Sequence, residues 1–173
     1  MRSIISRCVL IGLVGIICAA SVLFTPTVAH AQDKSRVRAA LVYNIIRFAR
    51  FPDAGDTLVL CALASDQSAP HLRAIEGRRA GSQRIRVSLL SSARQVSGNC
   101  DIVYLDSALP DTIRPARGQL VIGSARNFAD RGGMVGLIEF GGQVRFVIND
   151  GAAGRAGVRF SSQLLQLAAR VIT

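Results

Sequence analysis

A glycine-rich stretch near the end of the chain is the first candidate for chemistry. The residues from Gly151 to Gly157 read G-A-A-G-R-A-G and stand between a strand-like run and a helix-like run. Glycines at such a junction can cradle a phosphate group against the start of a helix. The stretch therefore raises the question of whether this chain is a nucleotide-binding enzyme.

The spacing and the neighbouring residues argue against a nucleotide site. A dinucleotide fingerprint has G-x-G-x-x-G in the first strand-to-helix turn and an acidic residue about 20 positions later. Here the spacing is G-x-x-G-x-x-G at the last element, and no acidic residue follows Asp150. A phosphate loop needs Gly-Lys-Ser/Thr, and this region has no Lys. We predict a short helical turn from Asp150 to about Arg155, stopped by Gly157.

Other catalytic arrangements also lack their usual residues. His30 falls in the N-terminal segment interpreted below as a signal, which leaves His71, in a short helical segment, as the one other histidine. Zinc needs three or four ligands, and one His with Cys61 and Cys100 does not readily supply them. No G-x-S-x-G motif presents a serine nucleophile, while carboxylate pairs formed by folding stay open. We therefore expect no catalytic residue, no metal and no cofactor.

The N-terminus has the pattern of a secretory signal peptide. Arg2 and Arg7 flank the start, an apolar run follows from Cys8 to Phe24, and Ala29-His30-Ala31 provides a small-x-small cleavage site. The apolar run is shorter than the roughly 20 residues of a membrane span. We therefore interpret residues 1–31 as a signal peptide and residues 32–173 as a single exported domain.

The exported domain is basic, but its basic residues are scattered. The whole chain carries 21 Lys and Arg against 11 Asp and Glu, a net charge of +10. Loss of Arg2 and Arg7 leaves 19 basic residues and a net charge of +8. No aromatic residues interleave with the arginines, as a nucleic-acid-binding stripe would require. A basic exported domain could suit an acidic partner or an anionic surface, but scattered arginines are more typical of an ordinary solvated surface, and we do not expect nucleic-acid binding.

Two cysteines remain after the signal, and their compartment favours a disulfide. Cys61 lies in the apolar run "TLVLCAL", and Cys100 immediately precedes "DIVYLD". Exported domains with two thiols usually bridge them. The bridge would join two predicted strands across a loop of about 40 residues. The alternative is a pair of inert, buried thiols.

The elements that must position these residues alternate between helices and strands. A helix is predicted from a cap at Ser35 to about Arg50, with apolar stripes that include Val37. Further predicted strands are "QRIRVSLL", "DIVYLD" and "QLVIG", with short helices at residues 69–75 and 124–133. This order predicts an α/β fold: a single-domain mixed sheet flanked by helices on both faces.

The C-terminal part carries the clearest local signal. The strand-like runs "MVGLIEF" and "QVRFVIN" are joined by Gly141-Gly142, which predicts a β-hairpin. A last helix is expected to begin near Ser161, with Leu164, Leu167 and Val171 in its core stripe.

The hairpin and its surroundings resemble the YfiR-like family of periplasmic proteins. The resemblance is carried by "RGGMVGLIEF", "QVRFVIN" and "SSQLLQLAARV", and at the front by "VRAALVYNIIRFARFPD". Phe51 stands where many members have Trp, and Cys61 and Cys100 match a cysteine pair of the family. The resemblance implies a regulator that represses an inner-membrane diguanylate cyclase, and so controls cyclic di-GMP, by binding the periplasmic sensor region of that enzyme.

The resemblance leaves the partner and the contact surface open. It carries over no catalytic or partner-binding residue, so Arg145 near the hairpin is only a candidate contact, with an ordinary solvated surface residue as the alternative. An accessory sensor for a membrane histidine kinase and an exported small-ligand-binding α/β domain are the alternative functions. A homodimer is also compatible with the sequence.

The signal-peptide interpretation makes a direct prediction. We expect the exported protein to begin at Gln32, because Ala29-His30-Ala31 is the best cleavage site after the apolar run. The intact mass of the periplasmic form measures this. A full-length species retained in the membrane fraction would contradict it.

Overall fold

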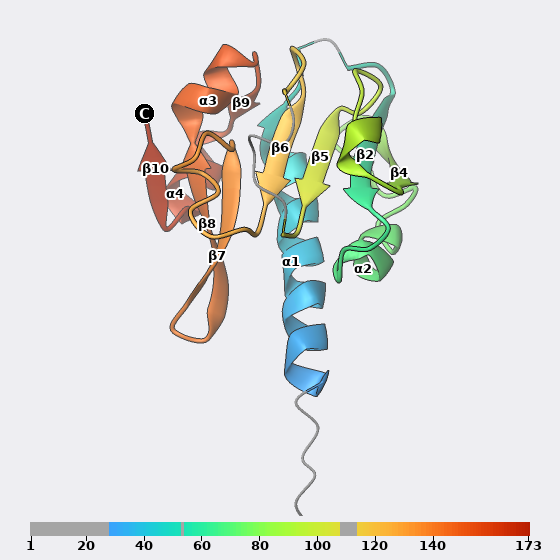
Figure 1. Ribbon diagram of the computed structural model, residues 1–173. Coiled ribbons are helices and arrows are strands. Elements are labelled where there is room, and N and C mark those ends of the chain that lie inside the picture. The colour runs from blue at the N-terminus through green and yellow to red at the C-terminus, as the bar shows by residue number, and fades with distance from the viewer. Residues whose placement is uncertain (1–27, 53, 108–113) are drawn as a thin grey trace, which may run out of the picture.

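The chain folds as the predicted α/β domain, here described from a computed structural model (Figure 1). The structure describes residues 28–52, 54–107 and 114–173. Its helices are α1 (Val28–Phe48), α2 (Ala69–Arg73), α3 (Asp150–Arg155) and α4 (Ser162–Leu167), with a 3-10 turn at Ala93–Gln95. Its strands are β1 (Ala49–Arg50), β2 (Thr57–Leu63), β3 (Arg79–Ala80), β4 (Gln83–Leu90), β5 (Ile102–Leu105), β6 (Leu120–Gly123), β7 (Val135–Phe140), β8 (Gln143–Asn149), β9 (Arg159–Phe160) and β10 (Arg170–Ile172).

The main sheet is mixed and has eight strands in the order β10-β8-β7-β6-β5-β2-β4-β3. Within it β4, β2, β5, β6 and β7 are parallel, whereas β7 pairs antiparallel with β8. Numbered along the chain, the five parallel strands have the order 2-1-3-4-5, the doubly wound order of flavodoxin-like folds. Figure 1 shows the carboxyl ends of β2, β5 and β6 together at the lower edge of the sheet. A separate two-stranded sheet pairs β1 with β9.

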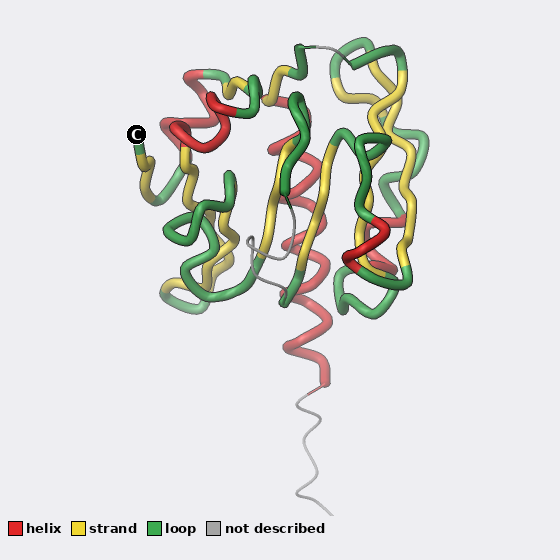
Figure 2. The backbone as a smooth tube through the Cα atoms, turned by 45° about the horizontal axis from the view of Figure 1, so that its top comes forward, coloured by secondary structure: helices red, strands yellow, loops and turns green. Residues whose placement is uncertain are grey.

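Helix α1 crosses behind the sheet and supplies much of the core on that side (Figures 1 and 2). Val42 and Ile45 are fully buried, and Ile46 is 1% exposed. The predicted cap at Ser35 is wrong, because the helix already runs from Val28 and Ser35 is buried within it. Val37, predicted to face the core, is 44% exposed, because the buried stripe follows the neighbouring positions.

The hairpin forms as predicted, between β7 and β8. Gly141 and Gly142 have φ values of 58° and 76°, the left-handed conformations that a tight two-residue turn requires. The glycine stretch also folds as predicted, because α3 occupies Asp150–Arg155 and Gly157 follows with a φ of 84°.

Two predictions about the flanking segments are wrong. Residues 124–133 form successive turns rather than a helix. The last helix begins as expected, with the Ser161 hydroxyl accepting from the Leu164 amide, but α4 ends at Leu167. The chain then enters β10, an edge strand, which leaves Leu167 67% and Val171 37% exposed instead of in the core.

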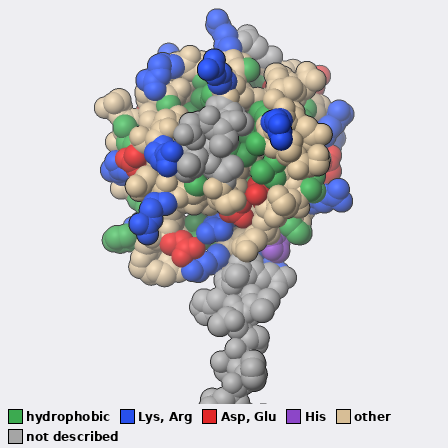
Figure 3. Space-filling model, viewed as in Figure 1, with side chains coloured by type: hydrophobic (Ala, Val, Ile, Leu, Met, Phe, Trp, Pro, Cys, Tyr) green, Lys and Arg blue, Asp and Glu red, His purple; other side chains and the backbone are tan. Residues whose placement is uncertain are grey.

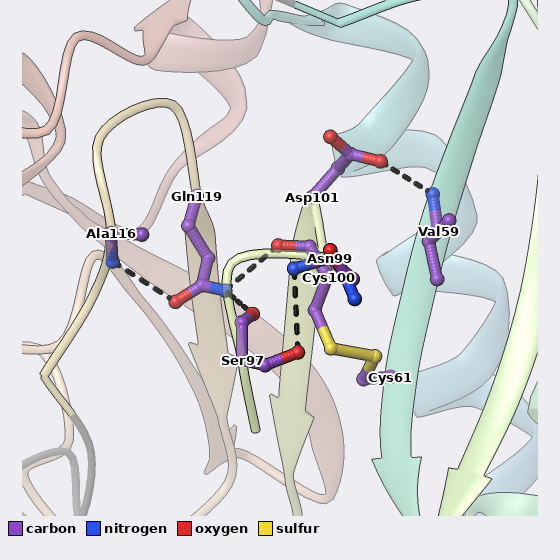
Figure 4. The surroundings of a disulfide bond; sticks show 8 residues. All are labelled: Val59, Cys61, Ser97, Asn99, Cys100, Asp101, Ala116 and Gln119. Carbon is purple, nitrogen blue, oxygen red and sulfur yellow. Dashed lines mark hydrogen bonds between the residues drawn. A yellow bond between two sulfur atoms is a disulfide. The ribbon is translucent and has the colours of Figure 1, made fainter. Parts of the chain in front are cut away.

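The predicted disulfide is present between Cys61 of β2 and Cys100, two residues before β5 (Figure 4). The two Cα atoms are 5.8 Å apart, and both residues are buried. Gln119 holds the same turn, because its side-chain amide donates to the carbonyl oxygens of Ser97 and Cys100 at 3.0 and 2.7 Å. The bridge therefore ties together the two strands at the centre of the sheet.

The signal-peptide prediction stays a prediction, because residues 1–27 lie outside the described residues. Within the described ranges, no helix has both the length and the apolar character that crossing a membrane requires.

Replacing both cysteines by serine should lower the free energy of unfolding by up to about 4 kcal/mol, because the bridge closes a long loop in the unfolded chain. Urea unfolding of the double variant and the oxidised parent measures the difference. Two free thiols in the denatured, unreduced parent protein would contradict the bridge.

Candidate functional site

The two faces of the β7–β8 hairpin have different surroundings. Directly opposite residues of an antiparallel pair point to the same face. Leu137 and Phe146 form such a pair on the face that packs into the core, where they are 3% and 7% exposed. Gly136 with Val147 and Ile138 with Arg145 form pairs on the opposite face. The hairpin thus presents a second face that the core does not use.

This second face lines a groove of about 390 Å³. We call it the hairpin groove, and its lining residues are Asn127, Phe128, Ala129, Asp130, Gly136, Ile138, Phe140, Arg145, Val147, Ala169 and Arg170. Most of the lining is apolar, and Phe140 at the end of β7 is 66% exposed. Arg170 donates twice to the Asp130 carboxylate, at 2.7 and 2.8 Å, which links β10 to the opposite wall.

Close packing around Phe128 holds one wall of the groove in place. Phe128 is 1% exposed, and its ring fills the space where side chains at Gly123 and Gly133 would otherwise stand. A Cβ atom at either glycine would collide with the ring, so both positions require glycine for packing. The turns at 124–133 are therefore anchored although they form no helix.

Arg145, the sequence candidate for partner contact, lies in this groove and is exposed. Within the part of the chain that the structure describes, its guanidinium has no hydrogen bond or salt bridge. Phe140 was not identified from sequence, because its position in "LIEF" is equally compatible with a core residue. The register of the hairpin places it outward.

The core-facing side of the hairpin carries a charged link to α1. Glu139 accepts from Lys34 Nζ at 2.7 Å and from Arg38 Nη2 at 3.1 Å. The hydrogen bond from Lys34 is the largest factor that lowers the pKa of Glu139. Arg38 also donates through Nη1 to Asp106 at 3.1 Å. One guanidinium thus joins the hairpin to the residue that directly follows β5.

Asp106 belongs to a polar cluster under the carboxyl ends of the central strands. The fully buried Tyr104 hydroxyl donates to Asp106 Oδ1 at 3.1 Å and lies 2.9 Å from Ser124 Oγ and 3.2 Å from Ser68 Oγ. Burial raises the pKa of Tyr104, with the charge of Asp106 adding to the effect. The phenol therefore stays protonated and serves as a fixed donor to Asp106.

Asp66 completes this cluster from the loop after β2. It is 7% exposed, and its Oδ2 atom accepts from the Asp106 amide at 3.2 Å. Burial is the main cause that raises the pKa of Asp66, and repulsion from Asp106 adds to it, although backbone hydrogen bonds oppose the shift. The ionised carboxylate is thus held at an energetic cost. Among the described residues, no group of three His, Cys, Asp or Glu is placed to hold a metal ion.

The sequence did not identify the pair Asp66 and Asp106, although Asp106 ends the predicted strand "DIVYLD" and Asp66 lies three residues after "TLVLCAL". His71 is half-buried in α2, and Ser161 serves as the cap of α4. The two carboxylates could have been predicted from their positions near the ends of predicted strands. Parallel strands bring their carboxyl ends to one edge of the sheet, and ligands bind at that edge.

The chain belongs to the YfiR/HmsC-like family, whose model matches residues 35–169. No curated protein matches the sequence significantly. Two solved structures are similar in outline. One is a conserved domain protein of Vibrio cholerae, with 13% identity and a TM-score of 0.46. The other is the ABC domain of Streptococcus pneumoniae in complex with L-Trp, with 14% identity and a TM-score of 0.45. They match 79% and 82% of this chain, which spans 60% of each.

Replacing Asp66 by Asn should stabilise the protein at neutral pH. A group whose pKa is raised on folding favours the folded state when protonated, and this contribution is lost as pH rises above the unfolded value of 3.8. Asn keeps the acceptor for the Asp106 amide without the charge. Urea unfolding at pH 7 and at pH 4 should show a gain that shrinks at the lower pH.

The exposed Asp56 provides the matched control, because Asp56→Asn should change stability little at either pH. An Asp66→Asn variant that is equally destabilised at both pH values would contradict a costly charge at this position.

Proposed function

We propose that this protein is a periplasmic regulatory binding protein that represses an inner-membrane diguanylate cyclase by binding its periplasmic sensor region. Membership of the YfiR/HmsC-like family supports a regulatory role at a membrane signalling protein. The buried Cys61–Cys100 disulfide is consistent with a location outside the cytoplasm.

The exposed Phe140 beside the hairpin groove is the observation that carries this proposal. Aromatic residues and arginine are enriched at protein interfaces, and Phe140 and Arg145 flank the same apolar groove. Phe140 is continuous with the apolar lining of the groove, and a contiguous exposed apolar surface of this kind marks a candidate protein-interaction site. The groove therefore suits an apolar segment of the partner with a carboxylate placed to meet Arg145.

The basic charge of the protein favours the same kind of partner. Figure 3 shows Lys and Arg spread around the visible face rather than gathered in one patch. Such a distribution raises the rate of association with an acidic partner without defining one contact. Specific binding then depends on the apolar groove.

Repression would operate through a shift in population. A repressor that binds only the inactive arrangement of the sensor region favours that arrangement by its difference in affinity for the two states. Moving the equilibrium from 99% active to 99% inactive requires roughly 5.5 kcal/mol of such difference. A standard interface of about 800 Å² per partner is large enough to supply it.

Deletion of the gene should raise cellular cyclic di-GMP when the cognate cyclase is expressed, and the full-length gene should restore the low level. A copy without residues 1–31 should fail, because it would not reach the periplasm. Unchanged cyclic di-GMP after deletion would argue against a cyclase partner and favour a histidine kinase.

Replacing Phe140 by Ser should weaken binding to the partner and lose repression with little loss of stability, because this side chain is already 66% exposed. Val37→Ala is the control, since Val37 is an exposed apolar residue outside the groove. Pull-down with the periplasmic part of the cyclase measures binding by each variant, and the cellular level of cyclic di-GMP measures repression. Equal repression by the two variants would exclude the groove.

A further inference from the structure

A second hollow lies at the carboxyl edge of the sheet, apart from the hairpin groove. It measures about 350 Å³ and is lined by Arg38, Ser65, Asp66, Gln67, Asp106 and Ser107. We call it the polar cleft. Ser65 and Gln67 follow β2, whereas Asp106 and Ser107 follow β5. None of its lining residues belongs to the hairpin groove.

The strand order of the sheet makes the position of the polar cleft a candidate ligand-binding site. From β2 the chain continues to β4 on one side, whereas the next strand, β5, lies on the other side of β2. The strand order therefore reverses between β2 and β5. In open α/β sheets, ligands bind outside the carboxyl ends of the strands at such a reversal. The polar cleft lies at this point, with side chains from both strand ends in its wall.

The charges in the cleft favour a positively charged ligand. Asp66 and Asp106 contribute two carboxylates to the lining. Among the described lining residues Arg38 is the one cation, and its guanidinium is already shared between Asp106 and Glu139. An anion would therefore meet two carboxylates and a guanidinium that is already paired.

The burial of the Asp66 carboxylate also favours a positively charged ligand. Asp66 is 7% exposed, and the hydrogen bonds described for its carboxylate come from backbone groups, among them the Asp106 amide. A buried carboxylate without a counter-charge is costly, and a cation in the cleft would remove that cost. Burial raises the pKa of Asp66, which is the expected effect of such a missing partner.

The remaining lining defines the kind of cation. The volume lies within the range of small-molecule sites and exceeds the space that one ion needs. Ser65, Gln67 and Ser107 are hydrogen-bonding groups near the carboxylates, and none of the described residues that line the cleft is aromatic. The complementary ligand has a protonated amine with hydroxyl or amide groups a few bonds away.

We infer that the polar cleft is a binding site for a small organic ammonium compound, with Asp66 and Asp106 holding the amine and the serine and glutamine side chains holding its polar substituents. The inference does not rest on repression of a cyclase. Arg38 connects Asp106 to Glu139 on β7, so an occupied cleft should also alter the surroundings of the hairpin.

The test uses the exported protein, labelled with ¹⁵N, titrated with amines and their neutral analogues. The probe pairs are glucosamine with glucose and putrescine with 1,4-butanediol, and inorganic phosphate is the anionic probe. We expect saturable shifts of the amides around residues 65–67 and 106–107 with at least one amine and with none of the neutral or anionic probes. Asp66→Asn should weaken that binding at least about tenfold, the usual effect of losing a charged hydrogen bond.

Glu139→Gln is the matched control, because it removes a carboxylate bonded to the same Arg38 but outside the cleft. It should bind the amine as the parent does, although the hairpin amides should no longer respond in the same way. Equal loss in both variants would indicate general charge attraction and overturn the site. Binding of phosphate, binding of glucose as tightly as glucosamine, or no saturable shift with either amine would also overturn it.

These outcomes are separable from those of the proposed function. Phe140→Ser should leave amine binding unchanged, because Phe140 does not line the polar cleft. Loss of amine binding without loss of repression would therefore count against the cleft alone, and the reverse would count against the hairpin groove alone.

Discussion

Burial of the central parallel strands is the constraint on which the rest of this structure depends. Leu58 and Leu60 of β2, Ile102 of β5 and Leu120 and Ile122 of β6 are all fully buried. Parallel strands covered on both faces can place polar side chains only at their ends. The polar cluster under β2, β5 and β6 follows from this constraint, because Asp66, Asp106 and Ser124 all lie in the segments just beyond those strands. The disulfide joins two of these strands, because it links Cys61 within β2 to Cys100 just before β5.

The hairpin extends this buried sheet with a part that is buried on one face. Its inner face packs into the core through Leu137 and Phe146, and its outer face leaves Phe140 and Arg145 at a groove. A strand pair with one solvated face can accept a partner without unfolding, whereas the central strands cannot. The hairpin groove and the most deeply buried part of the sheet therefore lie on different strands.

Arg38 connects these two parts. Its guanidinium contacts Asp106 at the centre of the sheet and Glu139 on the hairpin, both at 3.1 Å. The contact with Asp106 is largely shielded from solvent, whereas Glu139 is more exposed and Lys34 also bonds to it. The bond to Glu139 is therefore the weaker of the two and the one that solvent and salt screen more. A ligand or partner that changes the contact of Arg38 with Asp106 would therefore also change its contact with Glu139, and the reverse.

The sequence by itself determined the local elements. The Gly141-Gly142 turn, the alternation in "QRIRVSLL" and the Ser161 cap are signals carried by neighbouring residues, and these three features are present. The α/β class and the pairing of the two cysteines could also be predicted, because short alternating helices and strands allow few arrangements and the predicted exported domain has only two cysteines. The tertiary structure decided the features that depend on contacts between residues far apart in the sequence, such as side-chain burial and the proximity of Asp66 to Asp106. Two local predictions were wrong for this reason. Ser35 was predicted to cap α1 but is buried within the helix, and Leu167 was predicted to face the core but is 67% exposed. Asp66 and Asp106 are 40 residues apart, and only the strand order brings their carboxyl groups to one edge, because their proximity is a property of the sheet.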